Sequence, residues 1–160
     1  MKNGFVHGDY LYPAHYALLY FTKGKPAVFN RPKIHPRTCH ECGEPVKDYG
    51  GYWHIIDAKG INLSDVWDDL SPVRHRNTRL RKANQLPVLL TDRVVQIAGR
   101  EGGVLVDAFV GTGTAILSAL KRQMTFIGND LDPSALVIAE SRIRDEAMNL
   151  RKARRKSGAT

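Results

Sequence analysis

Val104-Leu105-Val106-Asp107-Ala108-Phe109-Val110-Gly111-Thr112-Gly113-Thr114 is the part of the sequence from which the architecture is inferred. It begins with a short, β-branched apolar run, which is typical of a buried parallel strand. Gly111 and Gly113 then predict a turn whose backbone approaches another group closely, and Thr114 begins a helix. A second strand over residues 125–129, followed by Asp130, completes a strand–helix–strand unit. We therefore expect an α/β fold.

The order of loop and carboxylate predicts a nucleoside site, because the glycine loop would receive the ligand and Asp130 would accept hydrogen bonds from a ribose. A dinucleotide fingerprint would need a third glycine where Ile116 stands, and the sequence contains no Gly-Lys-Ser/Thr phosphate loop. A ligand with a ribose but no phosphate fits better, which indicates S-adenosylmethionine. The predicted cofactor-binding residues are Asp107, Phe109, Gly111, Gly113, Thr114 and Asp130.

The segment 107–114 resembles the motif Asp-Pro-Phe-x-Gly-Ser-Gly-Thr of the DNA amino-methyltransferases, with Ala108 in the place of the proline. Residues 84–94 resemble the segment that precedes this loop in members with permuted motif order. Residues 48–51 and 62–69 resemble the variable region of a bacterial and phage subgroup. The resemblance implies a partial Rossmann-like sheet and methyl transfer to the exocyclic amino group of adenine or cytosine in double-stranded DNA.

The catalytic Asp/Ser-Pro-Pro-Tyr/Trp loop of that family has no match in this chain, which contains no Pro-Pro pair. Ser71-Pro72-Val73 lacks the second proline and the aromatic residue. The resemblance therefore implies a C-terminal, cofactor-binding portion with no catalytic residue of its own. We expect activity to require a second chain that carries the loop. The alternative is a non-catalytic nucleic-acid-binding remnant of a methyltransferase scaffold.

Four regions are expected along the chain. Residues 1–30 would form the N-terminal strand region, with a buried strand over residues 16–21, and residues 31–83 a loop-rich insertion and candidate target-recognition region. Residues 84–150 would form the cofactor-binding unit, and residues 151–160 a basic tail. The apolar periodicity predicts a helix from Pro87 with a stripe of Leu90, Val94 and Ile97, and a last helix capped by Asp132.

The 160 residues carry a formal net charge of +8, which favours a polyanionic partner. One basic run contains no acidic residue and is predicted to contact DNA phosphates through Arg74, Arg76, Arg79, Arg81 and Lys82. A second run, residues 151–156, is interpreted as a solvated tail. The longest apolar run is too short for a membrane span, and no signal peptide opens the chain, so we expect a cytoplasmic protein.

Cys39-His40-Glu41-Cys42 has the spacing of a zinc half-site, for which His35, His40 or His54 would have to supply further ligands. The alternative is a thiol-bearing turn or the remnant of a fuller site. Glycines and basic residues separate a set of aromatic residues that either stack on a flipped base or pack the insertion. These aromatic residues are Tyr49, Tyr52, Trp53 and Trp67, and packing is favoured for Trp67.

Overall fold

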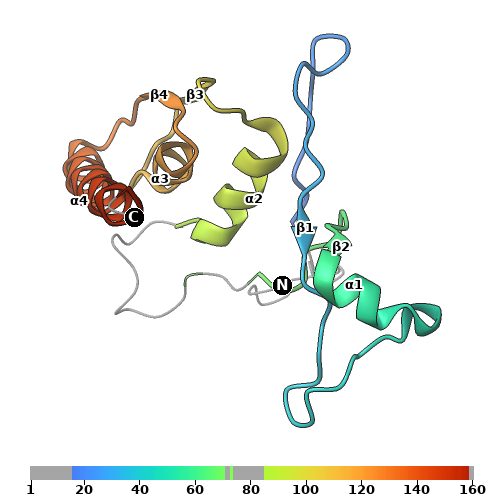
Figure 1. Ribbon diagram of the computed structural model, residues 1–160. Coiled ribbons are helices and arrows are strands. Elements are labelled where there is room, and N and C mark those ends of the chain that lie inside the picture. Colours follow the sequence, from blue (N-terminus) through green and yellow to red (C-terminus); the bar gives the residue numbers. More distant parts are fainter. Residues whose placement is uncertain (1–15, 71–72, 74–84, 159–160) are drawn as a thin grey trace, which may run out of the picture. The chain divides into compact units, whose positions relative to one another are not determined.

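The computed structural model describes residues 16–70, 73 and 85–158 (Figure 1). The chain divides into two compact units, of which one is Asn30–Trp67 and the other comprises the remaining residues. Each unit is described by itself. The larger unit contains the glycine loop.

The larger unit is built on two parallel strands. β3 (Val104–Asp107) pairs with β4 (Thr125–Gly128), with Val104 opposite Thr125 and Asp107 opposite Gly128. α3 (Thr114–Lys121) connects the two strands. The strand–helix–strand unit and the mixed α/β class predicted from the sequence are confirmed.

The core of this unit lies around α3. Val110, Ile116 and Ala139 are buried together, and Leu120, Phe126 and Ile143 pack against them. α2 (Val88–Ala98) and α4 (Pro133–Ser157) both contact α3, as Figure 1 shows. The helices therefore cover the sheet face that carries Phe126.

The opposite sheet face differs from the expectation of a fully buried strand. Val104 and Val106 of β3 and Ile127 of β4 share this face, because paired residues in a sheet point the same way and alternate residues point oppositely. Their exposed fractions are 59%, 71% and 61%. Parallel sheets are normally covered on both faces. Among the described residues of the larger unit no element covers this face, so the apolar pattern predicted the strand correctly and its burial wrongly.

α2 begins immediately after Pro87, as predicted, but it buries a different set of residues from the expected stripe. Thr91 and Val95 are buried, whereas Val94 is 41% exposed. The hydroxyl of Thr91 lies 3.0 Å from the hydroxyl of Ser118 on α3. Leu90 and Ile97 of the expected stripe are half-buried, so the prediction is wrong for Val94.

α4 starts as the sequence predicts, because Asp132 caps it by accepting a hydrogen bond from the amide of Ser134 at 3.0 Å. The helix then continues through Ser157, so the charged residues 151–156 are helical and exposed. No helix in the described ranges is both long and apolar enough to cross a membrane.

The buried strand expected over residues 16–21 is not found. This segment has no strand assignment, and its side chains are exposed, including Phe21 at 82%. A strand is stabilised by hydrogen bonds to a neighbouring strand. None of the described residues pairs with this segment, which explains why its apolar composition does not make it a buried strand here.

The smaller unit has short elements joined by loops. β1 (Lys33–Ile34) pairs antiparallel with β2 (Ile61–Asn62), and Lys33 lies opposite Asn62. The 3-10 helix η1 (Tyr49–Gly51) is capped by Asp48, which accepts a hydrogen bond from the Gly51 amide at 3.0 Å, and it precedes α1 (Trp53–Lys59).

Candidate functional site

The glycine loop, residues 107–114, is held by carboxylates at the ends of both strands. Asp107 accepts a hydrogen bond from the Phe109 amide at 2.9 Å through Oδ1. Asp130, two residues after β4, accepts one from the Gly111 amide at 2.6 Å through Oδ2. The Val110 amide also donates to the carbonyl of Asn129 at 2.9 Å. The loop is therefore fixed to the carboxyl ends of β3 and β4.

Two glycines allow the close contacts that surround this loop. Gly113 has a φ of 80°, in the left-handed region that favours glycine, and a Cβ added there would lie 3.1 Å from Cβ of Ala139 on α4. A Cβ added at Gly128 would lie 2.3 Å from Cγ2 of Val110. Val110 thus reaches the core across β4 only because residue 128 has no side chain.

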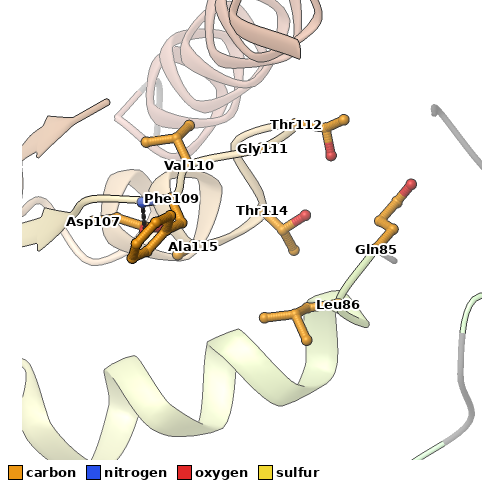
Figure 2. A pocket seen from close by; sticks show the side chains of 9 residues that line it. All are labelled: Gln85, Leu86, Asp107, Phe109, Val110, Gly111, Thr112, Thr114 and Ala115. Atoms are coloured by element: carbon orange, nitrogen blue, oxygen red, sulfur yellow. Dashed lines mark hydrogen bonds between the residues drawn. The ribbon is translucent and has the colours of Figure 1, made fainter. Parts of the chain in front are cut away.

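A small pocket lies between the glycine loop and the segment that leads into α2. Its volume is about 70 Å³. Figure 2 shows Gln85 and Leu86 on one side and Phe109, Thr112 and Thr114 on the other. The remaining lining residues are Asp107, Val110, Gly111 and Ala115. Sites for small molecules usually measure about 300–1,000 Å³, so these residues form only one wall of such a site.

Most of the predicted cofactor-binding residues lie together at this pocket. Asp107, Phe109, Gly111 and Thr114 line it, and Phe109 is 84% exposed. Gly113 does not line the pocket but packs on α4.

Asp130 is also absent from the pocket lining, although it was predicted to bind the ligand. Its carboxylate holds the loop through Gly111, and Oδ1 accepts a second hydrogen bond from the Asp132 amide at 3.0 Å. Contact with a ribose remains a prediction for this residue.

The structure adds residues that were not predicted from the sequence to belong to the site. The added residues that line the pocket are Gln85, Leu86, Val110, Thr112 and Ala115. Arg142 on α4 donates a hydrogen bond from Nη1 to the Thr112 carbonyl. The sequence does contain an indication of a buried role for Arg142, because this arginine lies between the apolar residues Ala139 and Ile143 on the inward side of the last helix.

α2 is joined to the segment before it by an ion pair. Arg93 donates to both carboxylate oxygens of Asp69, at 2.7 Å for the Nη1–Oδ1 contact, and only 8% of its side chain is exposed. The hydrogen bonds that Arg93 donates to Asp69 raise the pKa of Arg93. This pair fixes α2, which directly follows the segment that contains the pocket-lining residues Gln85 and Leu86.

The Cys39–Cys42 segment forms a turn, in which the Gly43 amide donates to the Cys39 carbonyl at 2.9 Å. Both cysteines are free thiols. Hydrogen bonds from the backbone of Cys42 and Glu41 lower the pKa of Cys39. No group of three or more potential metal-ligating side chains occurs among the residues that the structure describes. The zinc expectation therefore finds no support, because two thiols do not complete a tetrahedral site.

The aromatic residues of the smaller unit contact their own neighbours. Tyr49 stacks on Trp53 with ring centroids 6.2 Å apart, and Nζ of Lys47 lies 5.4 Å from the centre of the Tyr49 ring. The indole of Trp67 donates to the Ser64 carbonyl at 2.6 Å. These contacts agree with packing for Trp67 and leave the exposed Tyr52 as the freest ring of the set.

Of the two basic runs, the one at residues 151–156 lies among the described residues. The predicted DNA-binding residues Arg74, Arg76, Arg79, Arg81 and Lys82 lie outside the described residues. The second run lies on the last two turns of α4 and is exposed.

Comparison with known proteins places the sequence among DNA-modifying proteins. It matches the DNA methylase family (N6_N4_Mtase) over residues 1–141. It is 40% identical to the type II methyltransferase M.BamHI of Bacillus amyloliquefaciens over 151 residues, which are 94% of this chain and 36% of that protein. It is 29% identical to the type II methyltransferase M.HpaI of Haemophilus parainfluenzae over 136 residues, which are 84% of this chain and 40% of that protein.

The chain thus spans two-fifths or less of the length of these two curated relatives. Among solved structures, the M1.HpyAVI–SAM complex matches with 24% identity and a TM-score of 0.36, covering 37% of this chain and 29% of that chain. The family match extends over most of the sequence and confirms the resemblance inferred from the glycine loop and its flanks. This chain belongs to the DNA methylase family.

Proposed function

We propose that this chain is the cofactor-binding portion of a site-specific DNA amino-methyltransferase with a Rossmann-like sheet. The observation that carries the proposal is the glycine loop, which meets a pocket at the carboxyl ends of two parallel strands. Ligands of open α/β sheets bind at this edge. S-adenosylmethionine would supply an activated methyl group there, for transfer to the exocyclic amino nitrogen of adenine or cytosine.

The donor groups of the loop fit a ligand that has no phosphate. The loop contains no lysine, and the carboxylate of Asp107 lines the pocket, where it would repel a phosphate. Phe109 exposes most of an aromatic ring beside the pocket, and such a surface is stabilised by contact with an adenine or another apolar group.

Asp130 would also bind the ribose of the cofactor. Its carboxylate accepts hydrogen bonds from the Gly111 and Asp132 amides, and hydroxyl groups are donors of the kind that a carboxylate accepts. In this proposal Asp130 holds the glycine loop and accepts hydrogen bonds from the ribose hydroxyls at the same time.

The site would be completed by protein outside the described residues. The pocket is several times smaller than a typical ligand site, and the sheet face of Val104, Val106 and Ile127 is exposed. We propose that a segment or second chain carrying Asp/Ser-Pro-Pro-Tyr covers the sheet and supplies the acceptor for the amino group. Arg74, Arg76, Arg79, Arg81 and Lys82 would contact the phosphates of double-stranded DNA.

The test is the binding of S-adenosylmethionine to the chain, followed by amide chemical shifts in NMR spectra. We expect shifts at Phe109 and Gly111 with S-adenosylmethionine and with S-adenosylhomocysteine, and none with a dinucleotide, whose phosphates the loop does not accommodate. If only the dinucleotide shifts these amides, the cofactor assignment is wrong. If nothing binds even after a chain with the missing motif is added, the alternative of a non-catalytic nucleic-acid-binding remnant is favoured.

Phe109→Ala sharpens this test. Because the ring is 84% exposed, its removal should change the free energy of unfolding by no more than about 0.5 kcal/mol. The same change should weaken S-adenosylmethionine binding, since the ring would lose its contact with the ligand. Val137→Ala, at an exposed apolar position on α4, is the matched control and should change neither quantity.

A further inference from the structure

Arg142, on the inward side of α4, contacts the glycine loop through one terminal nitrogen. Nη1 donates to the Thr112 carbonyl, to Oγ1 of Thr112 at 3.1 Å and to Oγ1 of Thr114 at 3.4 Å. Thr112 and Thr114 are buried and line the pocket. A single cation therefore connects α4 to two loop residues that bound the candidate site.

Local stability does not explain a cation at this position. Thr114 is the first residue of α3, and a positive charge near a helix N-terminus opposes the helix dipole. No carboxylate among the described residues forms an ion pair with Arg142. Burial lowers the pKa of the guanidinium, although an arginine remains charged at neutral pH. The unfavourable terms are offset mainly by the three loop acceptors.

A second contact on the same side of α4 supports the loop from the adjacent turn. Ala139 precedes Arg142 by three residues, and residues with this spacing lie on the same side of a helix. A Cβ at Gly113 would lie 3.1 Å from Cβ of Ala139. α4 thus meets the loop at Gly113 by close packing and at Thr112 by hydrogen bonding, on the two sides of one peptide bond.

We propose that Arg142 is a positioning residue, which fixes the Thr112–Gly113 peptide and so the ligand-binding conformation of the glycine loop. Arg142 holds the carbonyl of that peptide together with the hydroxyls of Thr112 and Thr114, and both threonines line the pocket. The identity of the ligand, S-adenosylmethionine, rests on the proposed function. The effect of Arg142 on the loop conformation does not depend on which ligand is bound.

Hydrogen exchange of the loop amides, followed by mass spectrometry, tests this role. Arg142→Met keeps most of the apolar stem and removes every donor, and Arg144→Met is a matched control at an exposed arginine of the same helix. We expect peptides covering residues 109–116 to exchange about tenfold or more faster in Arg142→Met, since a charged hydrogen bond is worth about 1.5–3 kcal/mol. Arg142→Lys should recover part of the protection, and Arg144→Met should match the wild type.

The exchange pattern separates positioning from a general structural role. Positioning predicts faster exchange in the loop with unchanged exchange in the second half of α3 and in β4. If these elements lose protection to the same extent as the loop, or if Arg142→Met exchanges like the wild type, the inference is overturned.

Calorimetric titration with S-adenosylmethionine is the second measurement. Arg142→Met should weaken binding about tenfold or more, and Arg142→Lys should weaken it less. If the wild type binds no S-adenosylmethionine while Arg142→Met still loosens the loop, the proposed function fails and the positioning role stands. Unchanged affinity in Arg142→Met would overturn the role in ligand binding.

Discussion

At the scale of single residues, Asp130 holds the glycine loop in the structure and, in the proposed function, also binds the ribose of the cofactor. It holds the Gly111 amide and the Asp132 amide, one with each carboxylate oxygen. Removing it therefore affects the loop itself as well as any ligand. A carboxylate that follows the second strand is read easily from the sequence, whereas its use as an internal acceptor is visible only in the structure.

We expect Asp130→Ala to lower the free energy of unfolding by about 1.5–3 kcal/mol for each lost hydrogen bond. It should also weaken S-adenosylmethionine binding by about tenfold to a hundredfold. Asp130→Asn should have an intermediate effect on stability, because an amide can replace only one of the two acceptor oxygens. Chemical unfolding and calorimetry on each variant are the measurements.

Asp132→Ala is the control for this comparison, because Asp132 caps α4. It should cost about 1 kcal/mol of stability and leave the affinity for S-adenosylmethionine unchanged. Equal losses of affinity in the Asp130 and Asp132 variants would contradict the assignment of the ribose to Asp130.

Gly128 gives a second residue-scale test. We expect Gly128→Ala to lower the free energy of unfolding by about 1–3 kcal/mol, because its Cβ would lie 2.3 Å from Cγ2 of Val110. The double variant Gly128→Ala with Val110→Ala should be less destabilised than the sum of the two single variants, since the shortened side chain makes room for the new methyl group. Additive losses in thermal unfolding would show that the clash is not the cause.

At the scale of elements, two cationic segments that look alike in the sequence have different expected roles. Residues 151–156 continue α4 as exposed helix, and the dipole at a helix C-terminus favours cations there. The helix dipole therefore accounts for these cations without a nucleic-acid partner. The run from Arg74 to Lys82 has no acidic residues to offset its charge, which favours phosphate contacts.

We therefore expect Arg76→Ala, Arg79→Ala and Arg81→Ala together to weaken duplex binding and to flatten its dependence on salt. The slope of the logarithm of affinity against the logarithm of salt concentration should fall by about 0.9 for each lost contact. Fluorescence anisotropy with a labelled duplex measures this slope. The matched triple variant at Arg151, Arg154 and Arg155 should leave the slope near that of the wild type. If the α4 triple variant lowers the salt slope more than the Arg76, Arg79 and Arg81 variant does, the α4 run and not the Arg74–Lys82 run contacts the phosphates.

At the scale of the whole molecule, the sheet of the larger unit has one face packed against helices and one face that the described residues of that unit leave exposed. Methyl transfer requires both partners to be held in reacting geometry, and positioning accounts for most of such a rate enhancement. This sequence contains no Pro-Pro-aromatic motif to hold the base. We expect the purified chain to transfer no tritium from labelled S-adenosylmethionine to any duplex. Transfer by the chain alone would contradict the assignment of the catalytic loop to other protein.

Local sequence is sufficient to predict the strand–helix–strand unit, the start of α4 at Asp132 and the glycine loop. These features depend on local backbone chemistry: β-branched residues favour strands, glycines allow left-handed turns, and an aspartate before a proline caps a helix.

Which faces of these elements are buried depends on tertiary packing. Periodicity predicted Val94 on the inner side of α2, but Val94 is exposed, whereas Thr91 and Val95 are buried and Thr91 contacts Ser118 on α3. Val104 and Val106 have the composition of an interior strand, yet the described residues leave their face uncovered. Arg142 reached the glycine loop through a contact across 30 residues of sequence. Burial and long-range hydrogen bonds depend on which surfaces meet, and local sequence patterns do not contain that information.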